Sequence, residues 1–491
     1  MRNIFERKVE FGTVAIEDIF IDLQSRDEIP SILRSLQYIY CNTEIRDRVF
    51  SLLRQHITLS TKGRKGMCLW NIFVLGVLRV NANIDYDKLL ELANNHITIR
   101  QMLGHSDFVT YKRYGLQTIK DNASLLTEEL LMAINYVIVS EAHKIVNPQN
   151  IVLKTRCDSA VTPTNVHFPT DASLLWDAMR KSIILTGRLF EDLDLTAWRQ
   201  YNHNLNVIHR KYYSCAQHKQ KKDEDGIFTT KTLDIYDQYL SQTEKIITKI
   251  NISLNTLDLS NISVCQSVTI GIIKGYINDA EYQKGLIVRR IFGGETIQNK
   301  DKIHSIFERH TEWICKGKAG ISQELGIRIA ILEDQFGFIL SHRVMQEETD
   351  DKVPVEIIKN ALNHYPNISS CSFDKGFWSP ENRIKLEDLL DVVAMKKKGY
   401  SSKANYEYEH SEEFLEAKKG HSAVESAFNG LQNSGLDKCP DRGIKNYKKY
   451  IALAIVAKNI QKLGKVLINQ ENEVINRSIK IKEGLAKKNA A

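Results

Sequence analysis

Residues 150–161, NIVLKTRCDSAV, mark a change from helical to strand-like sequence. The segment is short and rich in β-branched residues, which is typical of a β-strand, and we expect the strand to end near Asp158. From about residue 172 to residue 314 the pattern is mostly helical, with a hydrophilic break, HKQKKDEDG, at 218–226. We therefore interpret residues 172–314 as a large helical insertion after the first strand.

Strand and helix patterns alternate after this insertion. GIRIAIL (326–332) and FGFILSHRVM (336–345) flank a tight turn and predict a β-hairpin. The elements that follow are a helix, VPVEIIKNALNHY; a strand, ISSCSF, ending at Asp374; a helix opened by Ser379 and Pro380; a strand, DVVAM; and a helix over residues 412–433. Without the insertion, this is the element order of an RNase H-like core in a mixed α+β protein, which we expect over residues 150–440.

The chain before the first strand is expected to contain an all-helical domain. In residues 44–149 apolar residues recur at helical spacing between short polar breaks. The basic residues Lys62, Arg64 and Lys65 precede the most apolar of these helices, where a helix N-terminus could meet DNA phosphate. We expect a DNA-binding domain, with a plain helical bundle as the alternative, and leave residues 1–43 unassigned.

Composition and charge limit the class of protein. The 491 residues are 43% hydrophobic and 26% charged, enough for two or three globular domains. Residues 441–491 hold twelve Lys and Arg against four Asp and Glu, a net charge of +8, while the rest carries about −1. A basic helical C-terminal tail suits a phosphate backbone, although a solvated lysine face has the same composition.

Neither a membrane segment nor a structural zinc site is expected. The most apolar stretch, residues 67–78, is interrupted by Asn71 and is shorter than the roughly 20 residues of a membrane helix. The start has no signal-peptide pattern, so we expect a cytoplasmic protein, associated with the nucleoid when active. The eight cysteines form no CxxC pair, and we expect free thiols.

Three carboxylates stand where the RNase H-like order would bring them together. Asp158 lies on the first strand, Asp374 at the end of the fourth, and Glu425 on the last helix. Two-metal phosphodiester cleavage requires hard oxygen ligands at one point. We therefore expect these residues to bind two Mg²⁺ or Mn²⁺ ions, although three acids among 60 acidic residues can also be well placed by chance.

Other side chains are expected beside this site. His421 lies one turn before Glu425 and would bind the scissile phosphate or position Glu425; a buried structural histidine is the alternative. Five lysines near the expected active edge are predicted to contact the DNA backbone: Lys396, Lys397, Lys398, Lys418 and Lys419.

Several further polar residues are interpreted as structural. His167 and Asp171 are expected to fix the turn after the first strand, and Asp334 to be solvated at a hairpin tip. The pair Asp350-Asp351 is interpreted as loop charge or as helix capping. The sequence contains no P-loop, GxGxxG or GxSxG signature.

Together these segments resemble insertion-sequence DDE transposases, and most of all the ISNCY type. The resemblance extends from the first strand almost to the end, with a weaker match in the N-terminal helices. Its segments are Asp158-Ser159, TNVHFPTD (164–171), Phe307 with His310-Thr311, KGK (316–318), DKGF (374–377), HSAVES (421–426) and GLDKCPDRG (435–443).

This resemblance implies a function in DNA transposition. Members bind terminal inverted repeats, cleave at the transposon ends, join the freed 3′-OH to target DNA, and act as multimers that bridge two ends. One departure concerns the Tyr, Arg, Glu and Lys pattern on the last helix of many relatives, since Lys418, His421 and Gln432 replace its Tyr, Arg and Lys. The alternatives are a nuclease of the same fold that does not join DNA, and a DNA-binding protein without catalysis.

Overall fold

Two compact units divide the chain. One comprises Met1–Asn165 with Ile314–Ala491, and the other Val166–Trp313. The computed structural model describes residues 2–5, 11–57, 66–107, 113–223, 226–258, 260, 262–315, 323–400 and 402–489, with side chains as far as residue 482.

Seven helices precede the sheet in the described part of the first unit. They are α1 (Glu28–Cys41), α2 (Thr43–His56), α3 (Leu69–Asn81), α4 (Tyr86–Asn95), α5 (Ile97–Met102), α6 (Leu116–Ala123) and α7 (Glu128–Val146). α1 lies within residues 1–43, for which the sequence predicts no element. Asp27 caps this helix by accepting from the Ile29 backbone N–H, and its Ile32, Leu36 and Ile39 are buried.

The N-terminal helices share one hydrophobic core with the sheet. Every residue of α3 is buried, so this helix needs packing partners on all sides. A separate helical domain over residues 44–149, which the sequence analysis expected, is therefore not what the structure has. These helices belong to the same compact unit as the strands.

The sheet is mixed, with strand order β2-β3-β1-β5-β6 and β4 paired to β3. β3 is antiparallel to both β1 and β4, while β5 is parallel to β1 and β6 is parallel to β5. The bounds are β1 (Leu153–Pro163), β2 (Glu312–Cys315), β3 (Gln323–Asp334), β4 (Ile339–Met345), β5 (Ile368–Phe373) and β6 (Val392–Met395).

β1 continues well past the position where the sequence analysis ended it. Asp158 lies in the middle of the strand, opposite Ile331 of β3, and the pairing runs on to Pro163 opposite Gly326. The strand is longer because β3 supplies hydrogen-bonding partners along this whole length. Asp158 is therefore held by β3 along one side of its backbone, one residue past the point where the pairing of β1 with β5 ends.

Among the residues described after the hairpin, the first unit has six α-helices: α12 (Pro354–Leu362), α13 (Pro380–Glu387), α14 (Lys403–Glu409), α15 (Glu412–Gly420), α16 (Ala423–Leu431) and α17 (Ile444–Asn489). The single helix expected over residues 412–433 is wrong, because α15 ends at Gly420 and α16 begins at Ala423. Glycine is a poor helix former, at about 1 kcal/mol less favourable than alanine, and it stands at this break.

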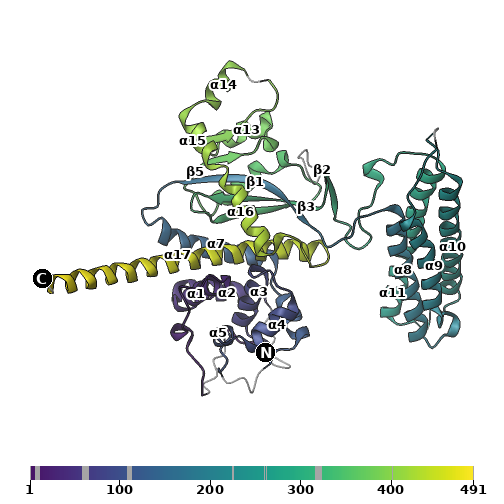
Figure 1. Ribbon diagram of the computed structural model, residues 1–491, viewed down its shortest axis with the longest axis horizontal. Helices are drawn as coiled ribbons and strands as arrows, with labels where there is room; N and C mark the ends of the chain where they lie inside the picture. Colours follow the sequence, from purple (N-terminus) through teal and green to yellow (C-terminus); the bar gives the residue numbers. More distant parts are fainter. Residues whose placement is uncertain are drawn as a thin grey trace. The chain divides into compact units, whose positions relative to one another are not determined.

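The C-terminal segment is a core helix along its first half rather than a basic tail. From Tyr447 to Leu467 all apolar residues of α17 except the half-buried Val466 are buried. Figure 1 shows α17 running between α1–α3 and the sheet, and the helix packs on α1, α3, α7 and β4. The charge count did not reveal this, because most lysines of this half are exposed or half-buried, and only Lys449 among them is buried.

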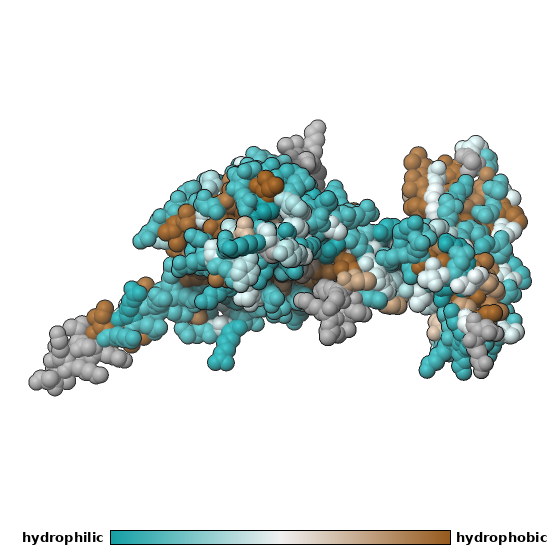
Figure 2. Space-filling model, turned by 90° about the horizontal axis from the view of Figure 1, so that it is seen from above, coloured by the Kyte–Doolittle hydropathy of each residue, from teal (hydrophilic) through white to brown (hydrophobic). Residues whose placement is uncertain are grey.

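The second unit is a bundle of four long helices, α8 (Asp171–Asp192), α9 (Tyr201–Gln217), α10 (Thr230–Asn255) and α11 (Val264–Ile287). It has its own hydrophobic core, which includes Trp198 and Tyr239. The hydrophilic break at 218–226 falls between α9 and α10. Figure 2 shows apolar residues on the surface of this unit, and Val264 and Val268 of α11 are exposed.

In the described parts of the chain, no single helix is long and apolar enough to span a membrane. Only α6 and α7 together, bent by 77°, meet the length and composition of a span, and most of α7 is buried in the core of the first unit. The eight cysteines are free.

Candidate active site

Asp158 is a half-buried carboxylate at the centre of the sheet. Its Oδ1 accepts a hydrogen bond from the Ser159 backbone N–H at 2.7 Å. Burial, followed by the negative charges of Asp374, Asp350 and Glu425, raises the pKa of Asp158 to about 6, although the Ser159 N–H acts in the opposite direction. Four carboxylates therefore influence one another at this place.

Asp374 comes from the strand next to β1. Cys157 of β1 lies opposite Phe373 of the parallel strand β5. Asp158 directly follows Cys157, and Asp374 directly follows Phe373. Because adjacent strands lie about 4.8 Å apart, the two aspartates start from neighbouring backbone positions. Asp374 is exposed, as expected of a residue that follows a strand at an open edge.

Glu425 is supplied by α16, which packs against β1. Val424 and Phe428 are buried in the core, whereas Glu425 is exposed beside them. The apolar stripe of the sequence thus fixes the helix on the sheet and leaves Glu425 at its border. The electrostatic effect of Glu425 on Asp158 agrees with this placement.

His421 lies at the break between α15 and α16 rather than on one continuous helix with Glu425. Its Nδ1 is 3.1 Å from the Ser372 Oγ of β5. Burial, and then the charge of Lys418, lowers the pKa of His421, while Asp374 and Glu425 act against this. His421 is therefore a mostly uncharged side chain in electrostatic contact with two of the three carboxylates.

Asp350 is a site residue that the sequence analysis did not identify. Its Oδ1 accepts from the Ser159 Oγ at 2.7 Å, and its Oδ2 lies 3.5 Å from the Arg328 guanidinium. A Cβ added at Gly376, two residues after Asp374, would lie 3.0 Å from the Asp350 Oδ2, so the glycine leaves room for this carboxylate. Only the fold reveals this, because the Asp-Asp pair looks like ordinary loop charge in sequence.

Arg156 was also missed. It pairs with Glu333 across the strands at 2.6 Å and donates to the Gly420 carbonyl oxygen at 3.2 Å. The arginine thus ties β1 to the end of α15, next to His421. Its sequence signal is weak, since an arginine in a strand is more often a surface residue.

The donor chemistry at this place fits hard divalent cations. Carboxylate oxygen is the ligand that Mg²⁺ and Mn²⁺ prefer. Burial raises the pKa of Asp158 most, and the neighbouring carboxylates, whose negative charge a cation would offset, raise it further. Within the described residues, however, no three His, Cys, Asp or Glu are gathered tightly enough to hold one ion. The side chains of Asp158, Asp374 and Glu425 would have to turn toward a common point.

The lysines expected to bind DNA have different positions. The Lys398 Nζ donates to the carbonyl oxygen of Gly376, two residues after Asp374, at 2.8 Å. The positive charge of Lys418 helps to lower the pKa of His421. Lys397 donates its backbone N–H to Glu409, and Lys396 and Lys419 are exposed. Lys62, Arg64 and Lys65 lie outside the described residues.

Two expectations about isolated polar residues have different outcomes. Asp334 is not solvated but fully buried, because it accepts from the backbone N–H groups of Phe336 and Phe338 at 2.9 Å and from the His143 Nε2 at 2.6 Å. His167 pairs with Asp177, and Asp171 with Arg290, inside the second unit.

Comparisons with models of protein families, with curated proteins and with solved structures find no match to this chain. The chemical interpretation of the site therefore rests on its own residues and their positions.

Proposed function

We propose that this chain is a DDE-type DNA transposase with an RNase H-like catalytic core. The observation that carries the proposal is the pairing of β1 with β5 in the register that makes Asp158 and Asp374 neighbours, with α16 bringing Glu425 to the same strand. If the short β2 is set aside, Asp158 is on the first strand, Asp374 follows the fourth and Glu425 is on a later helix.

In this proposal Asp158, Asp374 and Glu425 hold two Mg²⁺ or Mn²⁺ ions. Bound there, the ions would activate water or a DNA 3′-hydroxyl and neutralise the leaving oxygen, so no protein nucleophile is needed. Asp350 fixes the Ser159 hydroxyl beside Asp158. His421, uncharged near neutral pH, offers a hydrogen bond without adding charge, and Lys398 and Lys418 favour the DNA backbone electrostatically.

The proposed substrates are transposon ends and target DNA, and the proposed active form is an oligomer that bridges two ends. Support comes from the sequence segments that resemble insertion-sequence transposases, several of which line the site: Asp158-Ser159, DKGF and HSAVES. A cytoplasmic, nucleoid-associated location is part of the same proposal.

A strand-transfer assay with paired transposon ends tests this function. Wild-type protein with Mg²⁺ is expected to cleave the ends and join them to target DNA. Asp158→Asn, Asp374→Asn and Glu425→Gln should each reduce cleavage by more than about 100-fold, since even outer-shell partners of a metal cost about 10–100-fold. Asp388→Asn, an exposed acid at the end of α13, is the matched control and should stay active.

The outcomes separate the alternatives. Cleavage without joining supports a nuclease of the same fold, and end binding without cleavage supports a DNA-binding protein that lacks catalysis. Near-normal cleavage by any one of the three variants removes that residue from the metal site.

A further inference from the structure

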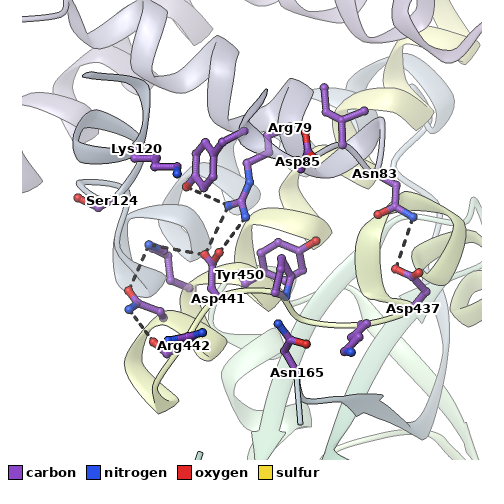
Figure 3. A pocket seen from close by; sticks show the side chains of 16 residues that line it. Arg79, Asn83, Asp85, Lys120, Ser124, Asn165, Asp437, Asp441, Arg442 and Tyr450 are labelled. Carbon is purple, nitrogen blue, oxygen red and sulfur yellow. Dashed lines mark hydrogen bonds and ion pairs between the residues drawn. The ribbon is translucent and has the colours of Figure 1, made fainter. Parts of the chain in front are cut away.

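A groove of about 770 Å³ lies in the first unit, between the ends of α3 and α6, the start of α4 and the turn before α17 (Figure 3). This volume is within the usual range for small-molecule sites. Its wall includes part of GLDKCPDRG (435–443), a sequence segment that the proposed active site does not use. Five cationic and three acidic side chains line it.

The base of the groove carries more positive than negative charge. Arg79, only 5% exposed, pairs with Asp441 at 2.8 Å and stacks 3.9 Å from the centre of the Tyr86 ring. Lys449, 8% exposed, lies 4.0 Å from the same carboxylate, and its one hydrogen bond within the described residues goes to the Asn446 Oδ1 at 3.3 Å. One carboxylate is thus shared by two buried cations, and Figure 3 shows Arg79 turned toward Asp441.

These buried cations have unused hydrogen-bonding capacity. The Arg79 Nε is buried and has no acceptor among the described residues. An ammonium group has three donors, and Lys449 uses one of them in a long hydrogen bond. Because buried donors without partners cost free energy, an acceptor that reaches the Lys449 ammonium from the groove would be favoured.

The rim of the groove adds further cations. Lys120 lies 5.7 Å from the centre of the Tyr86 ring, and Lys438 and Arg442 are exposed. None of these three is ion-paired with a carboxylate in the part of the chain that the structure describes. The acids are engaged instead: Asp85 caps α4 by accepting from the Lys88 N–H, and Asp437 accepts from the Asn83 amide.

We propose that this groove binds the phosphate of a nucleotide, carried either by a DNA strand or by a free nucleotide. Arginine and lysine are the side chains that recognise phosphate, and here they surround a cavity large enough for the attached nucleoside. Tyr86 and Tyr450 supply aromatic walls, and the amides of Asn83 and Asn165 supply polar groups for a sugar or base.

The position of Asn165 connects the groove with the proposed active site. Asp158 and Asn165 are seven residues apart along and just past β1, so they are separated by no more than about 23 Å. With a rise of about 3.4 Å per base pair, and with the reach of the side chains and the width of the groove added, a DNA phosphate in the groove would lie on the order of ten base pairs or fewer from the cleaved one. This spacing rests on the proposed function, whereas the phosphate chemistry of the groove does not.

The test measures binding by the full chain in EDTA, where no metal-dependent cleavage occurs. The probes are a fluorescent 30-base-pair duplex, followed by anisotropy, and dAMP, followed by calorimetry. The test variant carries three substitutions, Lys120→Ala, Lys438→Ala and Arg442→Ala. It should bind the duplex, dAMP or both at least about tenfold more weakly than wild type, since the loss of even one charge-assisted hydrogen bond costs enough free energy for a tenfold change in Kd. For DNA, the slope of log Kd against log salt should fall by about 2–3.

Lys245→Ala, an exposed lysine of α10, is the matched control and should bind as wild type does. All three rim residues are solvent-accessible to some degree, and melting temperatures will show whether the triple variant is folded. Weakened binding of dAMP identifies a free nucleotide as the ligand, and weakened binding of DNA alone identifies a strand phosphate.

Equal binding of both probes by the triple variant and by Lys245→Ala would overturn the proposal. Failure of the proposed function is distinguishable, since Asp158→Asn should abolish cleavage and leave binding at the groove unchanged. A wild-type chain that binds through the groove but never cuts DNA would reject the transposase activity only.

Discussion

Asp350 is linked to the proposed metal ligand Asp158 through Ser159, which hydrogen bonds to both carboxylates. It fixes the Ser159 hydroxyl and pairs with Arg328, and its charge acts on Asp158. A residue that orients a site in this way usually contributes about 10–100-fold to activity.

We therefore expect Asp350→Asn to slow DNA cleavage by about 10–100-fold while DNA binding changes little. The measurement is single-turnover cleavage of a transposon end with Mg²⁺. Asp351→Asn is the control, because Asp351 hydrogen bonds to Thr349 at the surface. Equal rates for the two variants would mean that Asp350 only shapes its loop.

The His342 side chain gives a pH prediction. Its Nε2 is buried without a partner among the described residues, and burial lowers the pKa of His342 to about 4. Below about pH 6.5 the unfolded chain takes up a proton here that the folded chain refuses until about pH 4. The folded state should therefore lose stability as the pH falls through this window, by at most about 3 kcal/mol.

Urea unfolding of wild type and His342→Gln at pH 7.5 and pH 5 measures this effect. The midpoint of wild type should fall more between the two pH values than that of the variant. His56→Gln, at an exposed position of α2, should behave as wild type does. Parallel pH dependence of wild type and His342→Gln would mean that other groups set the acid sensitivity.

At this scale the sequence could reveal residues whose role follows from local pattern. Asp374 follows a short apolar strand, and Glu425 borders an apolar stripe, so the positions of both on the fold followed from local pattern, while their role as metal ligands stays a prediction. The roles of Asp350 and Asp334 were not predicted. In sequence, one looks like an ordinary charged loop residue and the other like a charged turn residue, and only tertiary contacts distinguish them. Asp334 is buried only because His143, almost 200 residues earlier, packs against it.

Among the elements, α17 determines how the first unit is built. Its buried half lies against α1, α3, α7 and β4, so truncation near Asp441 would remove a core helix as well as positive charge. The closest approach is at Gly464, where a Cβ would lie 1.8 Å from the Ser31 carbonyl oxygen of α1. Only glycine lets the two helices approach this closely.

Gly464→Ala is expected to lower the free energy of unfolding by roughly 1–3 kcal/mol or more, because α1 or α17 must shift to make room. Gly420→Ala is the control: a Cβ there meets nothing within 4 Å, and alanine favours helix by up to about 1 kcal/mol. Thermal unfolding of both variants provides the measurement. A Gly464→Ala melting temperature equal to that of wild type would show that the α1–α17 contact is loose.

Periodicity in the sequence predicted most elements, and its failures have physical causes. The hairpin and the strands around Asp374 were found, since alternation and turns are local signals. The break at Gly420 was missed because the apolar stripe continues across it. The length of β1 was underestimated because its end depends on pairing with β3, about 170 residues later.

On the scale of the whole molecule, the two units have separate hydrophobic cores. The pairing of β1 with β3 joins residues 155–163 to 326–334, and no residue of the helical bundle takes part in it. The sequence indicated the helical insertion from its periodicity. It did not indicate that the N-terminal helices and the sheet share one core, because that depends on which apolar faces meet.

Separate cores predict separate unfolding. Replacing residues 171–307 by a flexible Gly-Ser linker should leave the first unit folded, since the linker keeps β1 and β3 in one chain and removes no residue of their shared core. Calorimetry of the full chain should show two transitions, and the deletion variant should keep only that of the first unit, within a few degrees. Residues 166–313 expressed alone should be helical and melt cooperatively. An unfolded deletion variant, or one transition for the full chain, would mean that the bundle and the sheet stabilise each other, and that the insertion contributes to the stability of the sheet that carries Asp158 and Asp374.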